Sequence, residues 1–329
     1  MSMNARQRLM DFAKNARGSV IDMFRPRVGA SPENDGVRIF ESPLFEDYRS
    51  LASGPQQEVV PVNLQTRSSE QIRQAADYSA RTGKVALDMT NQNRIPLAEK
   101  TVLEIGPGWD FGSAMIMGEN AKKLIVADKY LASWDNDFHP QVYRAIQTIL
   151  GKPSKLLDAV VASGGYNGHI ETLEEPAYAL GSISSNSVDY IYSNAVLEHV
   201  HPLDKAAVEL FRVTAPGGYG AHQVDFRYHR NFDYPLEYLL LTRAEFSKLL
   251  ELTHCEVGCQ TRVKEAAEYF AAAGFEIITV EVNGTASAEY MQNFLPRLRD
   301  SQISPYRDWP ADELSKISAR LIVRKPPAN

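Results

Sequence analysis

The stretch Thr101-Val102-Leu103-Glu104-Ile105-Gly106-Pro107-Gly108 is followed, about twenty residues later, by Leu124-Ile125-Val126-Ala127-Asp128. Each begins as a short apolar run that is typical of a buried strand, and the first run breaks into a glycine-rich turn. Glycines in such a turn let a ligand approach the backbone closely, and an acid after the next strand accepts hydrogen bonds from ribose hydroxyls. The two segments therefore predict a nucleotide-type pocket at the carboxyl edge of a parallel sheet.

The spacing of the glycines bears on which ligand the turn holds. A dinucleotide fingerprint has glycine at positions one, three and six of its loop, so that the pyrophosphate sits on a helix N-terminus. Counting from Gly106, the third position is Gly108, but the sixth is Phe111, and Gly112 comes one residue late. The Glu104 carboxylate would sit poorly beside a pyrophosphate and suits a positively charged ligand, such as the amino group or sulfonium of S-adenosylmethionine. A hydride-transfer enzyme is the more distant alternative.

Further segments follow in an order that matches an alternating α/β domain. Residues 187–200 have the pattern of a strand that runs into a loop and a short helix, and residues 203–213 have apolar positions at helical spacing. Proline and glycine in 214–218 stop that helix, and 219–224 has the pattern of the next strand. Near the end of the chain, 317–325 has the pattern of a last strand.

The E-x-G-x-G turn, Asp128 and the S-x-D-x-I-x-S…L-E-H-V…P-G-G succession resemble the motifs of class I S-adenosylmethionine-dependent methyltransferases of the type 11-like group. The resemblance covers roughly residues 85–326. It implies an α/β, Rossmann-like fold whose mostly parallel, seven-stranded sheet carries helices on both faces. It also implies which residues would hold S-adenosylmethionine: Glu104, Gly106, Pro107, Gly108, Asp128 and Asn194.

The size of the chain allows one large α/β domain with additions. Of its 329 residues, 44% are hydrophobic and 23% are charged, which is ordinary for a globular protein. We expect an N-terminal helical and irregular extension over 1–60 and the methyltransferase domain over 61–329, with a helical insertion at about 226–258 after the fifth strand. Two cysteines, Cys255 and Cys259, exclude a disulfide framework. With no signal-peptide pattern at the start, they favour a reducing, cytoplasmic location.

The charge of the chain bears on its partners. A net charge of −6 argues against a nucleic-acid substrate, because neutralising phosphates needs a concentrated basic surface. We therefore expect a small-molecule or glycan substrate. Residues 5–27 are locally basic, with apolar residues that would line one face of a helix. Such a helix packs on its own domain or on a neighbouring subunit of a homo-oligomer, or it touches a membrane surface.

The region after Asp128 gives weaker signals. We expect a helix from Pro140 onward and the third strand at 158–162. In the family that the chain resembles, an acid or amide after the third strand often meets the adenine, and Glu171, Glu174 and Glu175 are the candidates. Before the first strand, 69–82 has the pattern of a helix that Ser68 or Ser69 would cap.

A first group of chemically active residues, Glu198-His199-Val200-His201, comes directly after the fourth strand. Catalysis and a structural or cofactor-contacting role both suit Glu198 and His199. Some relatives have E-x-x-E-H here and bind magnesium with it, but Ala195 stands where the first glutamate would be. We therefore expect no metal, and Glu198, His199 and His222 are the residues that would hold one.

A second group lies at the end of the fifth strand, in His222-Gln223-Val224-Asp225-Phe226-Arg227-Tyr228-His229-Arg230. It resembles bacterial methyltransferases of surface-polysaccharide and other glycan gene clusters. Alternation along a strand places His222 and Val224 on one face and Gln223 and Asp225 on the other. We expect His222 or His199 to act as a base, with Asp225 and His229 orienting the base or the substrate. The alternative is that these side chains hold the insertion, which is itself a substrate lid or a packing helix.

The sequence therefore predicts an S-adenosylmethionine-dependent O-methyltransferase that acts on a hydroxyl of a sugar, a glycan precursor or another polar small molecule. Two alternatives stay open. One keeps the cofactor and moves the methyl group to nitrogen or carbon, since amine acceptors need little help from a base. The other is a binding protein that keeps the fold without turnover.

Overall fold

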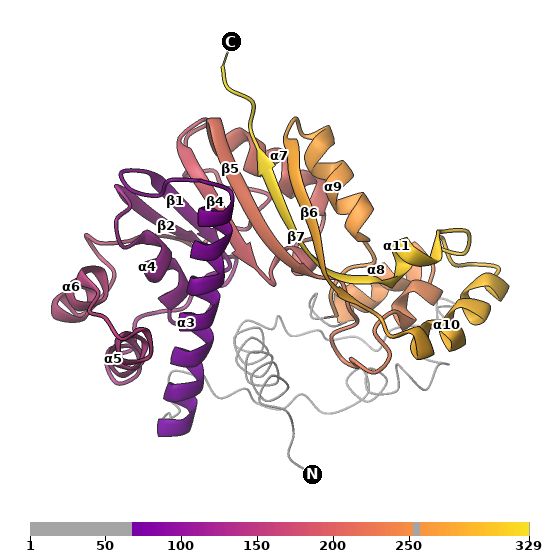
Figure 1. The fold of residues 1–329 in the computed structure, drawn as a ribbon, viewed down its shortest axis with the longest axis horizontal. Coiled ribbons are helices and arrows are strands. Elements are labelled where there is room, and N and C mark those ends of the chain that lie inside the picture. Colours follow the sequence, from indigo (N-terminus) through magenta and orange to yellow (C-terminus); the bar gives the residue numbers. More distant parts are fainter. Residues whose placement is uncertain (1–67, 253–256, 329) are drawn as a thin grey trace.

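The computed structural model of the chain describes residues 68–252 and 257–328. The predictions for the 1–60 extension, for the basic segment 5–27 and for Cys255 concern residues outside these ranges. The described residues form one seven-stranded sheet with helices on both faces and a helical lobe at one end (Figure 1).

The sheet has the strand order β3-β2-β1-β4-β5-β7-β6. Strand β7 is antiparallel to both β5 and β6, and the other pairs are parallel. This confirms the mostly parallel, Rossmann-like sheet that the motifs predict. The chain order reverses between β1 and β4, and ligands of open α/β sheets bind at such a switch point. The strands are β1 (Thr101–Ile105), β2 (Lys123–Ala127), β3 (Glu171–Leu173), β4 (Val188–Asn194), β5 (Thr214–Asp225), β6 (Glu276–Thr285) and β7 (Lys316–Arg324).

Two apolar clusters cover the two faces of the sheet. On the first face, helices α3 (Ser69–Gln92), α4 (Gly112–Gly118), α5 (His139–Leu150) and α6 (Lys155–Ser163) bury apolar residues against β1 and β2. On the second face, α7 (Leu203–Val213) and α9 (Val263–Ala272) pack against the central strands. The short helix η4 (Leu197–His199) follows β4 at its carboxyl end.

Helix α3 begins where its sequence provides a cap. The Ser68 hydroxyl accepts a hydrogen bond from the Gln71 amide, and the Gln71 side chain accepts one from the Ser68 amide. The helix extends ten residues beyond the predicted 69–82, to Gln92, because buried residues continue at helical spacing as far as Thr90. At Gly83, a Cβ would lie 2.8 Å from the Ile116 side chain, so glycine allows α3 and α4 to pack closely.

The prediction of a third strand at 158–162 is wrong, because these residues lie in α6. Ser154 caps that helix, and Leu157 and Val160 recur at helical spacing on its buried side. The true third strand, β3, has three residues, all half-buried. It lies at the edge of the sheet and has no apolar run, so hydrophobic periodicity gave no signal for it.

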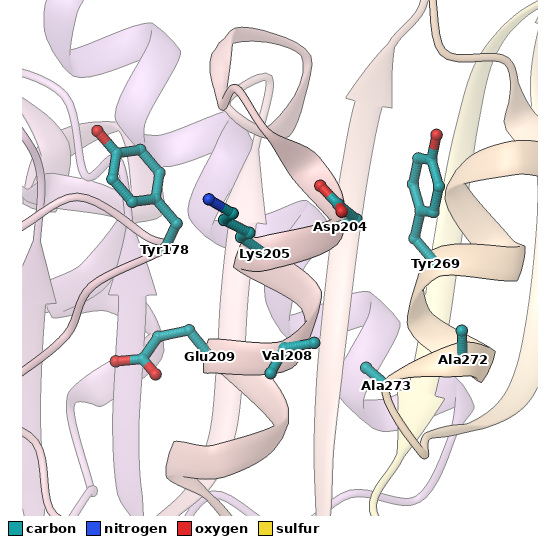
Figure 2. Close-up of a pocket in the computed structure, with 8 residues that line it drawn as sticks. All are labelled: Tyr178, Asp204, Lys205, Val208, Glu209, Tyr269, Ala272 and Ala273. Carbon is teal, nitrogen blue, oxygen red and sulfur yellow. The ribbon is translucent and has the colours of Figure 1, made fainter.

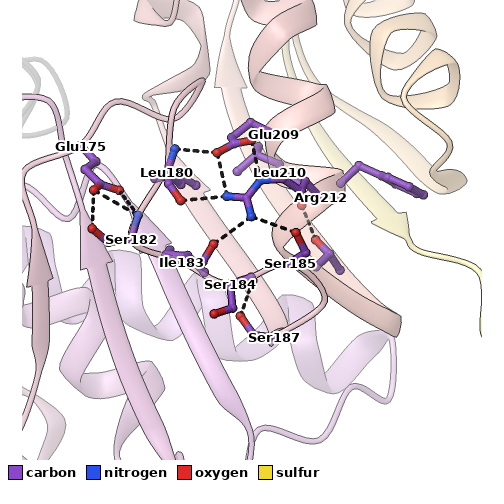
Figure 3. A network of polar contacts seen from close by, with 12 residues as sticks. Glu175, Leu180, Ser182, Ile183, Ser184, Ser185, Ser187, Glu209, Leu210 and Arg212 are labelled. Atoms are coloured by element: carbon purple, nitrogen blue, oxygen red, sulfur yellow. Dashed lines mark hydrogen bonds and ion pairs between the residues drawn. The ribbon is translucent and has the colours of Figure 1, made fainter.

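The connection from β3 to β4 lies along α7 (Figure 3). The Arg212 guanidinium donates to the backbone oxygens of Leu180, at 2.8 Å, and Ile183, at 2.9 Å. It also pairs with Glu209 at 2.8 Å, and Glu209 accepts from the Leu180 amide. These contacts hold an irregular connection in one conformation and so fix the entry into β4.

The insertions after β5 and after β6 pack together as a helical lobe with its own apolar cluster. Its helices are η5 (Glu237–Leu240), α8 (Arg243–Leu252), α10 (Ala288–Asp300) and α11 (Ala311–Ser315). Glu237, which is fully buried, accepts hydrogen bonds from Arg297 and Tyr290 of α10 and so joins the two insertions. The insertion after β5 is therefore a packing element, and a role as a lid stays a prediction.

No helix among the described residues combines the length and the apolar character that crossing a bilayer would require.

Candidate active site

Four strands end at the same edge of the sheet. Ile105 of β1 is in register with Ala127 of β2 and with Ser193 of β4, and Asn194 is in register with Gln223 of β5. The residues that follow these positions therefore meet at the carboxyl edge, beside the switch point. They are the glycine turn 106–108, Asp128, the residues after Asn194, and the segment from Asp225 onward.

The glycine turn has a shape that a side chain would not allow. Gly106 has φ +67°, and a Cβ there would lie 2.3 Å from Cγ2 of Val196. Gly108 has φ +76°, and a Cβ there would meet nothing within 4 Å. The first glycine thus lets the turn pack against the segment after β4, and the second leaves exposed backbone beside open space.

Glu104 lies under this turn, on the face of the sheet that α3 and α4 cover, and its side chain is 1% exposed. Its Oε1 accepts a hydrogen bond of 2.8 Å from the Ser113 hydroxyl of α4. Its Oε2 has no hydrogen-bond partner among the described residues. Burial raises the pKa of Glu104 to about 8, although the hydrogen bond from Ser113 acts in the opposite direction. A buried carboxylate oxygen of this kind fits a cationic ligand group.

A second buried acid, Asp110, fixes the segment after the turn. Its Oδ1 accepts from the Ser79 hydroxyl at 2.6 Å and from the Gly112 amide at 2.7 Å. Phe111 has φ +52° and is fully buried, with its ring 4.6 Å from the ring of Tyr166. Phe111 therefore packs beneath the turn and does not cover a ligand. We did not predict Asp110, although a carboxylate two residues before a helix is a recognisable capping signal.

Asp128 and Asn194 occupy the positions that the motifs predict. Asp128 directly follows β2, is half-buried, and accepts from the Tyr130 amide at 2.9 Å. Asn194 ends β4 and donates to the Tyr78 hydroxyl of α3 at 3.1 Å. Both residues stand at the same edge as the glycine turn, on neighbouring strands to either side of β1.

Glu198, His199 and His229 come together at the ends of β4 and β5. A potential ligand atom of each lies within 4.8 Å of those of the other two. The two imidazole rings are 4.8 Å apart, centre to centre, in an edge-to-face arrangement. Glu198 is fully buried and His229 is 8% exposed. We refer to these three residues as the Glu-His-His cluster.

Asp225 lies beside this cluster. Its Oδ2 is 3.8 Å from Nε2 of His229, and the Arg227 guanidinium donates to it at 2.6 Å. Burial alone would raise the pKa of Asp225, but hydrogen bonds from Arg227 and the charges of His229 and Arg227 outweigh burial and lower it. Asp225 is therefore an anion beside the His229 ring, and the expected role of Asp225 and His229 in orienting a base or the substrate stays a prediction.

His222 occupies a different environment. It is 1% exposed, its Nδ1 is 2.8 Å from the Ser193 hydroxyl, and its ring stacks on Phe270 of α9 at 5.0 Å. It thus faces the α7–α9 side of the sheet, opposite to Glu104, and burial lowers its pKa to about 3. This corrects the expectation for His222, because a core residue on that face does not reach a substrate at the edge. Among the metal candidates, His229 takes its place beside Glu198 and His199.

The three candidates for the adenine contact differ in position. Glu171 pairs with Lys123 across the β2–β3 pair, and Glu175 accepts from the Ser182 amide and hydroxyl. Glu174 directly follows the carboxyl end of β3 and is exposed. Position at the edge thus favours Glu174 among the three.

A separate groove of 470 Å³ lies between α7 and α9 (Figure 2). Both helices cover the face opposite to Glu104, so the groove is distinct from the site at the strand ends. It is lined by Tyr178, Asp204, Lys205, Val208, Glu209, Tyr269, Ala272 and Ala273.

Comparisons with known proteins found one family profile and several solved structures. A family profile described as a methyltransferase domain matches residues 146–221, from within α5 into β5. No protein with curated function matches the sequence. Geranyl diphosphate C-methyltransferase from Streptomyces coelicolor has 12% identity and a TM-score of 0.45, over 86% of this chain and 98% of that one. An S-adenosylmethionine-dependent methyltransferase from Mesorhizobium loti has 14% identity and a TM-score of 0.42, over 71% and 94%.

Phosphoethanolamine N-methyltransferase 2 from Haemonchus contortus has 15% identity and a TM-score of 0.39, over 71% of this chain and 50% of that one. Similarities this low carry no argument about the substrate. The strand order and the glycine turn with its two acids are those of a Rossmann-like fold, and a methyltransferase-domain profile matches part of this chain, residues 146–221.

Proposed function

We propose that this protein transfers the methyl group of S-adenosylmethionine to a hydroxyl oxygen of a polar small molecule, such as a sugar or a glycan precursor. Glu104 supports the cofactor half of the proposal most directly. Its buried Oε2 lacks a hydrogen-bond partner among the described residues and lies beneath a turn with open space at Gly108. The amino group of the cofactor carries the hydrogen-bond donors and the positive charge that this oxygen would accept.

The neighbouring strand ends complete the proposed cofactor site. The exposed backbone at Gly108 allows close approach of the cofactor, and the Asp128 carboxylate would accept from two ribose hydroxyls. Asn194 lies at the end of β4, on the other side of β1 from Asp128. Its side chain, which donates to the Tyr78 hydroxyl, would border the methionine part of the cofactor. When bound, the cofactor supplies an electrophilic methyl group on a sulfonium, so the chain must chiefly position the acceptor.

The acceptor half of the proposal comes from the Glu-His-His cluster. During transfer an O–C bond forms, the S–C bond breaks with its electron pair going to sulfur, and the acceptor hydroxyl must lose its proton. Loss of this proton is promoted by imidazole and carboxylate groups. The cluster is near the turn, because Val196, which touches the Gly106 position, is two residues before Glu198. An amine acceptor would need little such help, so the cluster favours oxygen over nitrogen.

Purified full-length protein tests the proposal in two stages. Calorimetry measures binding of S-adenosylmethionine and S-adenosylhomocysteine, which we expect for the wild type. Methyl-labelled cofactor is then incubated with monosaccharides, nucleotide sugars, short glycans, catechols and primary amines, and products are identified by mass spectrometry. We expect a methyl ether and a sharp loss of its formation in His199→Ala and His229→Ala. The matched control is His169→Ala, which changes a half-buried histidine in the connection between α6 and β3.

Two outcomes would contradict the proposal at different points. If the protein binds neither S-adenosylmethionine nor S-adenosylhomocysteine, the proposed methyltransferase activity is wrong and the alternative of a binding protein is favoured. Binding with only N- or C-methylated products, formed equally well by the two histidine variants, would keep the cofactor and remove the hydroxyl acceptor.

A further inference from the structure

We propose that Glu198, His199 and His229 bind one divalent transition-metal ion beside the acceptor position. One carboxylate and two imidazoles present ligand atoms within 4.8 Å of one another. Metal–ligand bonds of about 2.0–2.2 Å would place such atoms roughly 3–4 Å apart around a shared ion, so small rotations of these side chains close the site.

The fold brings the ligands from two separate segments. Glu198 and His199 lie on η4, and the amide of His199 donates to the Val196 oxygen at 2.8 Å. His229 lies thirty residues later, after β5, and its amide donates to the Val257 oxygen at 3.4 Å. The backbones of Gly258 and Glu198 both lie beside the half-buried His201 ring. The two halves of the cluster are therefore held together by the surrounding backbone.

Gly258 packs closely against the segment that leads to His229. It has φ +89°, and a Cβ there would lie 2.9 Å from the Arg227 oxygen and 3.6 Å from the His229 ring. A residue with a side chain would be strained in this conformation and would press on the segment that carries His229. The position of the third ligand thus depends on a glycine that no sequence motif marks.

Asp225 lies behind His229 and would orient this proposed metal ligand. It lies 3.8 Å from Nε2 of His229, and its charge is already balanced by the Arg227 guanidinium, which donates to both carboxylate oxygens. A carboxylate behind a metal-binding histidine fixes the orientation of the ring. We therefore assign Asp225 as a positioning residue and leave it out of the ligand set.

The ligand types select the ion. Calcium and magnesium prefer sites made of oxygen atoms, whereas imidazole suits zinc, iron, cobalt, nickel and copper. Two histidines with one carboxylate hold such an ion through three protein ligands and leave positions open for water or a substrate. The site therefore suits a divalent ion of the iron-to-zinc series.

This site deepens the proposed function and, in its catalytic role, rests on it. A substrate hydroxyl that binds at an open position of the ion would have a lowered pKa and lose its proton to solvent. The resulting alkoxide, held beside the glycine turn, would attack the methyl carbon, with the sulfur taking the electron pair. The histidines would then act through the ion and not as free bases.

Metal binding is tested first without any turnover. Protein treated with a chelator and then freed of it is titrated with Co²⁺ followed by its visible absorption, and with Zn²⁺ by calorimetry. We expect one ion per chain and visible bands typical of nitrogen ligands. Removing an outer partner of a metal ligand typically weakens metal binding by about 10- to 100-fold, and removing one of three ligands should weaken it at least as much. We therefore expect Glu198→Gln, His199→Ala and His229→Ala each to lose Co²⁺ binding at the concentrations that saturate the wild type.

Controls separate loss of ligands from loss of fold. His169→Ala should keep the Co²⁺ spectrum, and every variant should keep its affinity for S-adenosylhomocysteine if the domain is intact. A variant that loses both is replaced by His199→Gln or His229→Asn. No binding of Co²⁺ or Zn²⁺ to the wild type, or equal binding by the ligand variants, would overturn the proposal.

The methyl-transfer assay separates this inference from the function on which its catalytic role rests. Methyl ether formation that survives complete removal of metal would disprove the role of the ion and leave the O-methyltransferase intact. Stoichiometric metal binding without any transfer to a hydroxyl would leave the site in place and remove the proposed reaction.

Discussion

Replacing Glu104 by glutamine should stabilise the protein without its cofactor. A buried carboxyl whose pKa is about 8 stays protonated at pH 7, whereas in the unfolded chain it ionises at its ordinary value of 4.5. The 2.5 pH units between 4.5 and 7, at about 1.4 kcal/mol each, correspond to about 3 kcal/mol of destabilisation. Glutamine has the same shape and carries no such cost, and it still accepts from Ser113.

The pH dependence has a definite sign. Because the folded state binds this proton more tightly than the unfolded state, the free energy of unfolding falls as the pH rises from 4.5 to about 8. Glu104→Gln should therefore match the wild type near pH 4.5 and exceed it by about 3 kcal/mol at pH 7. For a domain of this size, that gap corresponds to roughly 6–12 °C in melting temperature.

The same substitution should weaken binding of S-adenosylhomocysteine. A hydrogen bond with a charged group contributes about 1.5–3 kcal/mol, so the loss should be about 10- to 100-fold. Urea unfolding at pH 5 and pH 7 and calorimetry with the ligand measure the two effects. The buried Glu104 thus lowers the stability of the protein without its cofactor and raises its affinity for the cofactor.

Glu237→Gln is the matched control, because that buried carboxylate already pairs with Arg297 and Tyr290. It should destabilise the protein at pH 7 and leave ligand binding unchanged. A Glu104→Gln variant that is less stable than the wild type at pH 7, or whose advantage is the same at pH 5, would refute the reasoning.

Three further predictions follow from the same geometry. The affinity for S-adenosylmethionine should rise by up to about tenfold per pH unit between pH 6 and 8, because the ligand needs the ionised form of Glu104. Calorimetry should also show release of nearly one proton on binding at pH 7. An affinity that does not change with pH would contradict this. Gly106→Ala should lower the free energy of unfolding by about 2 kcal/mol or more, since its Cβ would lie 2.3 Å from Val196. Gly108→Ala should lower it only by the backbone strain of about 1 kcal/mol. Equal losses for the two variants in urea unfolding would show that the contact with Val196 is unimportant. Because His222 has its pKa lowered to about 3, its contribution to the free energy of unfolding should fall by about 3 kcal/mol between pH 6.5 and pH 4. Glu104 acts in the opposite direction over this range, so the effect is measured as the difference between the wild type and His222→Leu at each pH. His222→Leu should keep cofactor binding, and a variant that fails to bind the cofactor would show that His222 belongs to the site.

Several elements were predictable because their signals are local. The glycine turn, the acids at 104 and 128, and helix α7 follow from short-range patterns of apolar residues, glycine and proline. Strand β3 and helix α10 were not predicted. The first has three half-buried residues. The second has Ser287 as a cap and buried residues at 291, 294 and 298, but Pro296 interrupts the pattern.

Local sequence patterns were not sufficient to place the histidines relative to the site. Alternation along β5 correctly separated His222 and Val224 from Gln223 and Asp225, because side chains of a strand point to opposite faces. It did not tell which face carries the site, since that depends on the helices that cover the sheet. Phe270 and α9 cover the His222 face, and α3 and α4 cover the Glu104 face.

The sequence by itself determined the class of fold and the residues of the proposed cofactor site, because the glycine turn and the acids after adjacent strands are set by the local backbone. Only the tertiary structure decided the composition of the Glu-His-His cluster. His229 joins Glu198 and His199 because β4 and β5 are neighbours that end at one edge, and because Gly258 lets its own segment pack against the Arg227 backbone. Contacts between residues thirty positions apart depend on the register and packing of whole elements, which no spacing within a motif records.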